Sequence, residues 1–229
     1  IAEDTLLKAI DIMGCDFWQV YGLTETTGLG ATMSPEDYDP KKGKLRSCGK
    51  AYPGIDVKIV DEQNNELPVG GVGEILLKGD IIMKGYWNKP EANKESIVDG
   101  WFYTGDAGYF DDEGFLYIHD RVKDMIVSGG ENVYPAEVEN ALMAHENISD
   151  AAVIGIPDDK WGEAVKGIVV VDKDLSEDEI IEFARTRIAG YKCPKSIDFI
   201  KELPRNPGGK ILRRELRTPY WKGRDRNVS

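Results

Sequence analysis

The sequence predicts a mixed α/β fold, in which the end of a large α/β domain, with a small β-barrel-like subdomain, precedes a compact α+β domain at the carboxy terminus. Helical and extended patterns alternate near both ends of the chain, whereas short strands and turns fill its middle, from about residue 45 to residue 120. The length of 229 residues is enough for one large domain or two small ones. We therefore expect one domain over residues 1–120 and a second over residues 121–229, with the boundary at Arg121–Lys123.

The amino-terminal segment predicts a helix, a strand and a polar loop in that order. Residues 3–13 have a helical apolar period, and Gly14 ends the run. The apolar face is formed by Leu6, Leu7, Ile10 and Met13. Residues 16–20 are typical of a short buried strand, and the polar loop Tyr21–Gly28 follows. This order occurs in open α/β sheets, where ligands bind at the carboxyl ends of strands.

The middle of the chain predicts the small sheet or barrel-like subdomain. Residues 57–60 alternate between apolar and polar side chains, and Asp61–Glu66 forms a polar turn. Another strand is expected at Gly73–Gly79. The sequence Asp111–Gly114 is typical of a hairpin turn before a strand at Phe115–Ile118.

The last hundred residues predict a compact domain that mixes helices and strands. Pro135 suits the first position of a helix, and Ser176 with Glu179 forms a capping box for a second helix, which we expect to run to Ala189 and to end at Gly190. The first helix should turn Val138, Ala141 and Leu142 inward. Strands are expected at Ala151–Ile156, Gly167–Val171 and Ile197–Ile200.

The charge of the chain is unevenly distributed. The formal net charge is −12 at pH 7, yet residues 192–226 contain eleven Lys or Arg against four Asp or Glu. A globally acidic chain with one basic end is not the pattern of a general nucleic-acid binder, so we expect no nucleic-acid partner. The basic end can still hold a small polyanion.

The composition also excludes several other classes. No apolar stretch approaches the length of a membrane-spanning helix, and no signal-peptide pattern opens the chain. Cys15, Cys48 and Cys193 are odd in number and far apart, which indicates free thiols in a reducing cytoplasm. His119 and His145 have no Cys or His neighbour at metal-ligand spacing, so we expect no zinc site.

The loop after the first strand carries groups suited to a nucleotide. Tyr21 offers a flat face for a purine base, and Gly22 lets the backbone approach a ligand closely. Thr24 can donate to a phosphate oxygen, and Glu25 is a hard oxygen ligand suited to Mg²⁺. The alternative is an ordinary capped turn, because Thr, Glu and Gly are common in loops.

Two further segments carry weaker signals of the same kind. In Tyr103–Asp106, Gly105 permits a tight turn and Asp106 can accept both hydrogen bonds of a ribose diol; the alternative is a plain Gly-Asp turn. Farther on, Arg121 gives a fork of donors for ribose and phosphate oxygens. Ser128–Gly130 is backbone with few side-chain obstructions and can line a narrow passage; the alternative for the surrounding region is a charged linker that leads into a helix.

Lys210 is the strongest catalytic candidate near the end of the chain. It follows Pro207–Gly209 and lies beside Arg213 and Arg214. Its ammonium group could offset the charge that develops in a phosphoryl-transfer transition state. The alternative is a solvated lysine in a basic tail.

Four segments, taken together and in this order, resemble the signature motifs of the adenylate-forming superfamily, which includes acyl-CoA synthetases, luciferases and the adenylation domains of peptide synthetases. The segments are Tyr21–Glu25, Tyr103–Asp106, Asp120–Glu139 and Leu203–Lys210. The resemblance spans essentially the whole chain but only the later half of a typical family member. It implies an ATP-dependent carboxylic acid–CoA ligase, with a fatty or aryl acid as substrate and with ATP, Mg²⁺ and coenzyme A as cofactors and cosubstrates.

The resemblance also implies a role for each candidate residue. It assigns adenine stacking to Tyr21, close backbone approach to Gly22, phosphate contact to Thr24, metal ligation to Glu25, ribose contact to Asp106 and Arg121, the hinge at 121–124 to Lys123, a thioester-forming passage to Gly129 and Gly130, and adenylation to Lys210. The family usually has Ser or Thr where this chain has Gly208, which removes one possible hydroxyl contact and leaves the lysine.

Other expectations concern what the sequence does not contain. No Ser/Thr/Gly-rich loop ending in Lys-Gly, which wraps the β- and γ-phosphates in the family, is present, and the chain starts at Ile1 rather than Met. We therefore expect a fragment that lacks the amino-terminal half of the enzyme and is inactive alone, and the intact enzyme could form a homo-oligomer. The alternatives are an adenylation module of a peptide synthetase, a luciferase-like enzyme, which the motifs alone do not distinguish, or a non-catalytic fragment that binds polyanions.

Overall fold

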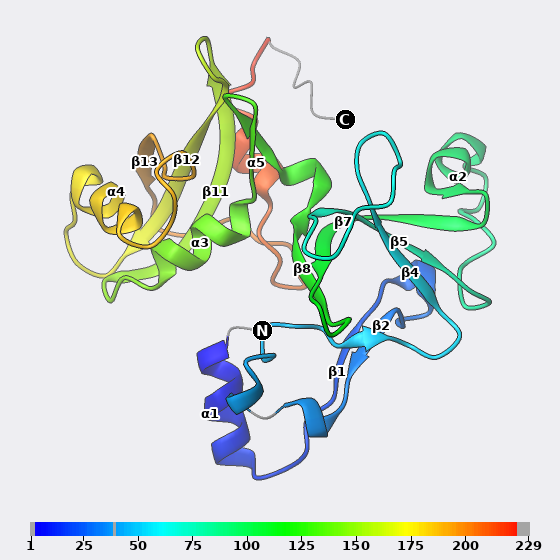
Figure 1. Cartoon of the computed structure of the whole chain (residues 1–229). Coiled ribbons are helices and arrows are strands. Elements are labelled where there is room, and N and C mark those ends of the chain that lie inside the picture. The colour runs from blue at the N-terminus through cyan, green and yellow to red at the C-terminus, as the bar shows by residue number, and fades with distance from the viewer. Residues whose placement is uncertain (1–2, 39, 224–229) are drawn as a thin grey trace. The chain divides into compact units, whose positions relative to one another are not determined.

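The chain folds into two separately packed units, residues 1–119 and residues 120–229. The structure is a computed structural model that describes residues 3–38 and 40–223, and each unit is described by itself (Figure 1). Helices and antiparallel or mixed sheets occur in both units, so the predicted mixed α/β fold class is confirmed. Residues 224–226, at the end of the basic segment, lie outside the described part of the chain.

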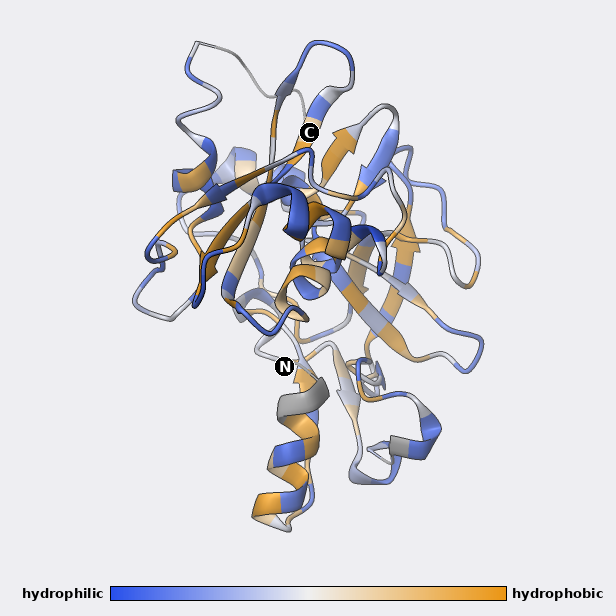
Figure 2. Ribbon diagram, turned by 90° about the vertical axis from the view of Figure 1, so that its left-hand side faces the viewer, coloured by the Kyte–Doolittle hydropathy of each residue, from blue (hydrophilic) through white to orange (hydrophobic). Residues whose placement is uncertain are grey.

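The first unit begins with helix α1 (Glu3–Met13), as the apolar period predicts. Leu6 is 2% exposed and packs with Met33, Tyr38 and Leu45. Hydrophobic and hydrophilic residues both occur along α1 (Figure 2). Met13, which the apolar period places on the same face, is 66% exposed at the last position of the helix and lies outside the cluster around Leu6.

A three-stranded antiparallel sheet follows, and it corrects the strand that we expected at residues 16–20. Its strands are β1 (Gln19–Tyr21), β2 (Ala31–Met33) and β3 (Lys50–Ala51), in the order β1-β2-β3. The first strand starts three residues later than predicted and is not buried: Val20 is 50% exposed, and Trp18 before it is 65% exposed. The reason is that β1 is an edge strand, with one side of the ladder and one face open in the described residues.

The second sheet of this unit is the predicted β-rich subdomain. Its strands are β4 (Asp56–Val60), β5 (Gly73–Lys78), β6 (Ile97–Val98), β7 (Trp101–Phe110) and β8 (Leu116–Arg121), in the order β4-β5-β7-β6, with β8 paired to β7. Ile59, Ile75 and Leu77 form its core with Leu116. Both the alternating strand at 57–60 and the strand from Gly73 are confirmed. A short helix, α2 (Pro90–Ser96), was not predicted.

The hairpin turn between β7 and β8 is built by Asp111, as its sequence predicts. The Asp111 Oδ1 atom accepts hydrogen bonds from Glu113 N–H (3.0 Å) and Phe115 N–H (2.9 Å). Asp111 also pairs with Lys44 at 2.7 Å. Short 3₁₀ turns connect other elements of the chain; their bounds are Thr24–Thr26, Pro35–Asp37, Pro40–Lys42 and Val122–Asp124.

The second unit is a five-stranded sheet flanked by helices. Its strands are β9 (Ile126–Ser128), β10 (Glu131–Val133), β11 (Ile148–Asp158), β12 (Gly162–Val171) and β13 (Ser196–Phe199), in the order β10-β9-β12-β11, with β13 parallel to β12. Its helices are α3 (Pro135–Met143), α4 (Glu177–Arg185) and α5 (Arg213–Arg217). The expected strands are therefore present, and two of them are longer than predicted.

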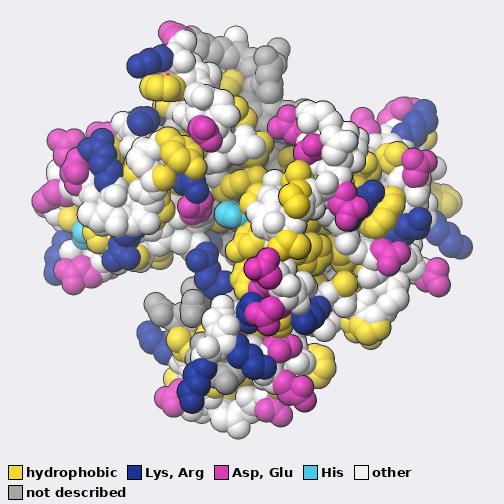
Figure 3. Space-filling model, viewed as in Figure 1, with side chains coloured by type: hydrophobic (Ala, Val, Ile, Leu, Met, Phe, Trp, Pro, Cys, Tyr) yellow, Lys and Arg dark blue, Asp and Glu magenta, His cyan; other side chains and the backbone are white. Residues whose placement is uncertain are grey.

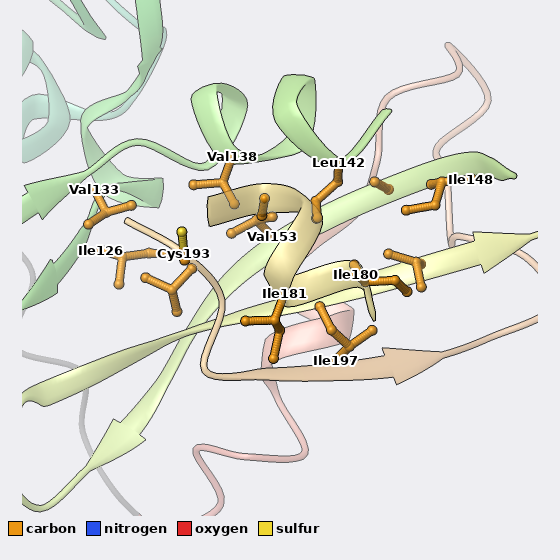
Figure 4. Packing of buried hydrophobic residues seen from close by; sticks show 14 residues of the cluster. Ile126, Val133, Val138, Leu142, Ile148, Val153, Ile180, Ile181, Cys193 and Ile197 are labelled. Atoms are coloured by element: carbon orange, nitrogen blue, oxygen red, sulfur yellow. The ribbon is translucent and has the colours of Figure 1, made fainter. Parts of the chain in front are cut away.

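Helices α3 and α4 pack together over one face of this sheet (Figure 4). Val138, Ala141 and Leu142 of α3 are buried, as predicted. Ile180 of α4 and Val153 of β11 belong to the same cluster. Because side chains alternate across a strand, Ala152 and Ile154 of β11 face the other side, where they pack with Ile168 and Leu203 and contact residues of the α5 region.

The capping box of α4 is confirmed, but the end of that helix is not where we expected it. Ser176 N–H donates to Glu179 Oε2 at 2.8 Å, and Glu179 N–H donates to Ser176 Oγ at 3.3 Å. The helix ends at Arg185 rather than Ala189. The Thr186 hydroxyl donates to the Phe183 carbonyl oxygen at 2.7 Å, and such local bonding competes with helix propagation. Gly190 is therefore not the helix cap.

Three further observations concern membrane-spanning helices, surface charge and the cysteines. None of the helices in residues 3–38 and 40–223 is both long and apolar enough to cross a membrane. Acidic and basic side chains are interspersed on the visible face (Figure 3). All three cysteines are free; Cys15 is exposed, while Cys48 and Cys193 are buried.

Candidate functional site

The polar loop after β1 is a tight turn held together by Thr26. The Thr26 hydroxyl accepts a hydrogen bond from Leu23 N–H (2.9 Å) and donates one to the Leu23 carbonyl oxygen (3.1 Å). Gly28 N–H donates to the same carbonyl oxygen at 2.8 Å. Thr26 is fully buried, whereas Thr24 is exposed and Glu25 is half-buried. The turn therefore supports Thr24 and Glu25 at the surface, and Thr26 is a residue that the sequence analysis missed.

Gly22 is required by the close return of the loop on itself. A Cβ atom at this position would lie 2.2 Å from the carbonyl carbon of Gly28 and 2.3 Å from its oxygen. Both neighbours are backbone atoms, so no side-chain rotation can relieve the contact. Gly22 thus allows the loop to close, which is a structural requirement in addition to its predicted closeness to a ligand.

We expect Gly22→Ala to destabilise the first unit by about 2 kcal/mol, because the loop must open to admit the methyl group. Gly190→Ala is the control, since a Cβ at Gly190 would meet no atom within 4 Å. Urea unfolding, monitored by hydrogen exchange in each unit, measures the loss of stability in each of the two variants. Equal stability of the two variants would show that the loop accommodates the methyl group without cost.

The structure joins two of the predicted segments, because the Tyr21 hydroxyl donates a hydrogen bond to Asp106 Oδ2 at 2.8 Å. Asp106 is buried, at 7% exposure, while Tyr21 is half-buried. Burial and, to a smaller extent, the negative charge of Asp106 raise the pKa of the Tyr21 hydroxyl. This group therefore stays protonated and remains a donor. Tyr21 and Asp106 are 85 residues apart in sequence, and this contact holds their side chains together.

The segment Tyr103–Asp106 is not the tight turn that we expected. It lies inside strand β7, where the register with β5 shifts and Gly105 has a φ of +70°. The Thr104 hydroxyl donates to the Ile75 carbonyl oxygen (2.7 Å) and accepts from Asp106 N–H (3.1 Å). Glycine serves here as part of a bulge, a feature that redirects side chains at functional sites. The irregularity thereby orients Asp106.

Glu25 is held by a segment of the unpredicted region around α2. The Tyr86 hydroxyl donates to Glu25 Oε1 at 2.9 Å, and Met83 N–H donates to the Glu25 carbonyl oxygen at 2.7 Å. No cluster of three or more His, Cys, Asp or Glu side chains able to hold a metal ion occurs in the described chain. A single carboxylate fits Mg²⁺ when substrate phosphates and water supply the other ligands, so the residues present suit the predicted ion.

Arg121 and Lys123 lie at the start of the second unit. Arg121 is the last residue of β8, and its N–H donates to Asp120 Oδ1 at 2.7 Å. Lys123 is exposed in the 3₁₀ turn Val122–Asp124. Asp120 also accepts a hydrogen bond from Ala136 N–H (2.7 Å) in the first turn of α3. The predicted hinge segment is therefore bonded to the second unit at Asp120.

Gly129 and Gly130 form a two-residue hairpin turn between β9 and β10. Ser128 pairs with Glu131, and the glycines have φ values of +64° and +86°. Positive φ at both positions is the requirement of a type I′ hairpin turn. The Trp161 side chain lies beside Gly129, where a Cβ atom would be 2.6 Å from its ring, and Gly129 N–H donates to the Trp161 carbonyl oxygen at 2.8 Å. Both glycines are exposed.

Lys210 lies in a short turn at the end of the second unit. Lys210 N–H donates to Asn206 Oδ1 (2.9 Å), and Asn206 N–H donates to the Lys210 carbonyl oxygen (2.9 Å). Arg205 also closes this turn, through a bond to the Gly209 carbonyl oxygen at 2.7 Å. The Lys210 side chain is exposed, and its amine forms no ion pair with any described residue. The amine is therefore available for a substrate.

An ion-pair cluster, which we call the arginine cluster, fastens the helix after Lys210 to the start of the unit. Arg213 makes a two-pronged contact with Glu139 of α3, with Nη2 at 2.6 Å from Oε2. Arg213 and Arg217 also pair with Asp124, at 3.9 and 3.5 Å. Burial alone would lower the pKa of Arg213, but Glu139 raises it. The sequence pattern placed Arg213 in a basic tail and gave no sign of these partners.

The candidate residues are thus divided between the two units. Tyr21, Gly22, Thr24, Glu25 and Asp106 belong to residues 1–119. The remaining candidates, in residues 120–229, are Arg121, Lys123, Gly129, Gly130 and Lys210. The structure brings Tyr21 to Asp106. The roles assigned to these residues remain predictions.

Comparison with known proteins matches both units to one family. The family model described as AMP-binding enzyme matches residues 1–87, and the model described as AMP-binding enzyme C-terminal domain matches residues 137–210. The two models cover most of the chain, in the order in which the sequence motifs occur.

Individual relatives agree with this match. A fatty acid–[acyl-carrier-protein] ligase of Streptomyces coeruleorubidus is 42% identical to this chain. The match covers the whole chain and 44% of the length of the relative. A long-chain fatty acid–CoA ligase of Mycobacterium tuberculosis is 46% identical over 95% of the chain and 42% of its own length. The o-succinylbenzoate CoA synthetase of Bacillus subtilis, solved with its acyl-adenylate intermediate, is 39% identical over 98% of this chain and 44% of that one, with a TM-score of 0.84.

The chain thus spans less than half the length of the relatives that it matches. Because both family models match in order and the fold agrees with a solved relative, the chain belongs to the AMP-binding enzymes, the adenylate-forming superfamily.

Proposed function

We propose that the protein is an ATP-dependent carboxylic acid–CoA ligase that activates a fatty or aryl acid. The observation that carries the proposal is the hydrogen bond between Tyr21 and Asp106, because it brings two separate adenylate motifs into contact within the first unit. The names of the relatives support the substrate class, since they include ligases for fatty acids and for an aryl acid.

In the first half-reaction, a carboxylate oxygen attacks the α-phosphorus of ATP, and the bond from that phosphorus to the bridging oxygen breaks to release pyrophosphate. Asp106 and Arg121 would hold the ribose, and Thr24 would donate to a phosphate oxygen. Glu25 would hold Mg²⁺, which when bound supplies positive charge to the phosphates. The exposed ammonium group of Lys210 would offset charge that develops in the transition state.

In the second half-reaction, the sulfur of a thiol attacks the acyl carbon, AMP leaves, and the thiol proton passes to water. The Gly129–Gly130 turn would line the approach of the thiol, because its exposed backbone carries no side chains. Lys123, exposed between Val122 and Asp124, would act in the hinge at 121–124. Coenzyme A is the proposed thiol. The proposed location is the cytoplasm, and the three free cysteines agree with its reducing conditions.

The phosphopantetheine thiol of an acyl carrier protein is a second candidate acceptor. One relative that matches the whole chain is a fatty acid–[acyl-carrier-protein] ligase. CoA and the carrier protein present the same reactive thiol, so the adenylation residues have the same roles with either one. The two acceptors are separated by assaying them side by side.

The test is a pyrophosphate–ATP exchange assay of the protein as the cell makes it, with a panel of fatty and aryl acids. We expect exchange that depends on the acid and on Mg²⁺ but needs no thiol. Thioester formation is then measured by mass spectrometry, with CoA and with a phosphopantetheinylated carrier protein. Production of ADP instead of AMP, or absence of acid-dependent exchange across the panel, would contradict the proposal.

A further inference from the structure

The Glu25 carboxylate is supported by a chain of contacts that starts in helix α2. Asn93 of α2 forms two hydrogen bonds with the backbone of Tyr86: Tyr86 N–H donates to Asn93 Oδ1 at 2.6 Å, and Asn93 Nδ2 donates to the Tyr86 carbonyl oxygen at 3.0 Å. The Asn93 side chain lies so close that a Cβ at Gly85 would be 2.9 Å from it. Asn93 therefore holds both the N–H group and the carbonyl group of Tyr86.

Two hydrogen bonds connect this segment to Glu25, one from the Tyr86 side chain and one from the backbone of Met83. The Tyr86 hydroxyl donates to Glu25 Oε1 at 2.9 Å, and Met83 N–H donates to the Glu25 carbonyl oxygen at 2.7 Å. A tyrosine hydroxyl can donate to a carboxylate oxygen, and hydrogen bonds to carboxylates are stronger than those between neutral groups.

We propose that Tyr86 is a positioning residue that orients the Glu25 carboxylate for a divalent cation bound to a nucleotide. The inference rests on the proposed function, because it adds a support to the metal ligand of the adenylation step. A carboxylate accepts several hydrogen bonds, so the bond to Oε1 leaves Oε2 available for the cation.

The physical reason is that a half-buried glutamate side chain has several rotamers, only some of which direct an oxygen to the cation. The hydrogen bond from Tyr86 selects among them before the cation arrives. Partners of this kind, one step behind a metal ligand, change metal affinity by about 10- to 100-fold when they are removed. Tyr86 itself makes no contact with the cation in this scheme.

The experiment compares Tyr86→Phe with the wild-type protein as the cell makes it, using Mn²⁺ as the probe and a non-hydrolysable ATP analogue. Mn²⁺ binding is followed by electron paramagnetic resonance. We expect Mn²⁺ to bind about tenfold more weakly to Tyr86→Phe in the presence of the analogue. Binding of the analogue without metal should be unchanged, and in the exchange assay the Mg²⁺ concentration for half-maximal rate should rise with little change in the maximal rate.

Tyr117→Phe is the matched control. The Tyr117 hydroxyl also donates to a carboxylate, Asp111 Oδ2, at 3.3 Å in the same unit, but Asp111 belongs to a hairpin turn. We expect its Mn²⁺ affinity to equal that of the wild type. Asn93→Ala, which leaves the Tyr86 hydroxyl in place but removes the clamp on its backbone, should weaken Mn²⁺ binding in the same direction as Tyr86→Phe.

Three results would overturn the inference. Tyr86→Phe that binds Mn²⁺ as well as the wild type does would remove the positioning role. An equal loss in Tyr86→Phe and Tyr117→Phe would indicate general weakening of the unit. A loss of metal-free nucleotide binding in Tyr86→Phe would place its effect elsewhere. If the wild type itself bound no Mn²⁺–nucleotide complex and catalysed no exchange, the proposed function would fail, and that outcome is distinct from these three.

Discussion

Lys210→Ala should slow acyl-adenylate formation by about a hundredfold or more, while transfer of an acyl group from presynthesised acyl-adenylate to the thiol should be nearly unchanged. The loss is that expected when one preorganised charge partner of a transition state is removed. Lys210 is exposed and has no ion-pair partner in the described residues, so its removal leaves no buried charge behind. The effect should therefore be on catalysis and not on stability.

The two half-reactions are measured separately, by pyrophosphate exchange and by thioester formation from added acyl-adenylate. Lys201→Ala is the control, because Lys201 is also exposed and lies nine residues before Lys210. It should retain wild-type rates in both assays. Equal damage to both half-reactions in Lys210→Ala would contradict a role confined to adenylation, and an unchanged exchange rate would return Lys210 to the class of solvated lysines.

Arg213→Met should destabilise the second unit by about 3 kcal/mol. The side chains of Arg213, Glu139 and Asp124 are 19%, 13% and 12% exposed. Removing the guanidinium leaves the Glu139 carboxylate buried without its cation, and breaking such a pair costs far more than an exposed ion pair contributes. The value lies at the lower end for a buried pair because Val153 N–H still donates to Glu139 at 2.8 Å.

The same change should make stability depend on pH. Burial raises the pKa of Glu139, and Arg213 opposes the rise. Without Arg213 the folded-state pKa moves further above the unfolded one, so the folded protein binds the proton more tightly. Stability then falls as pH rises from the unfolded-state pKa of Glu139 to its folded-state pKa. The loss of stability relative to wild type should therefore be smaller at about pH 5 than at about pH 8.

Hydrogen exchange and urea unfolding of residues 120–229 measure these effects. Arg214→Ala is the control, because Arg214 lies beside Arg213 in α5 but is exposed, and a surface change of this kind is worth within about 0.5 kcal/mol. A loss below about 1 kcal/mol in Arg213→Met, with no pH dependence, would mean that water replaces the guanidinium without cost.

Local patterns were sufficient to predict several elements. Pro135 marked the start of α3 and the apolar period gave its buried face, because both signals lie within one or two helical turns. The capping box of Ser176 and Glu179 likewise acts over three residues. The four adenylate motifs were recognisable because close backbone approach and phosphate contact restrict residue choice over short stretches.

The failures have a common origin in contacts that are distant in sequence. Gly105 looked like a turn residue, yet it lies in a bulge of a long strand, which only the pairing with β5 reveals. The apolar residues near Val20 suggested burial, but β1 is an edge strand. The contacts Tyr86–Glu25 and Arg213–Glu139 span 61 and 74 residues, and no local rule links such positions.

The arginine cluster has a topological consequence for the second unit. Asp124, near the place where the chain enters, is bound to Arg213 and Arg217, near the place where the described chain ends. A segment whose first and last residues lie close together, as residues 124 and 217 do here, can be exchanged between enzymes as a cassette, because both junctions fall near one point. Such an exchange would preserve the ion pairs of the arginine cluster, provided that its acidic and basic residues are transferred together.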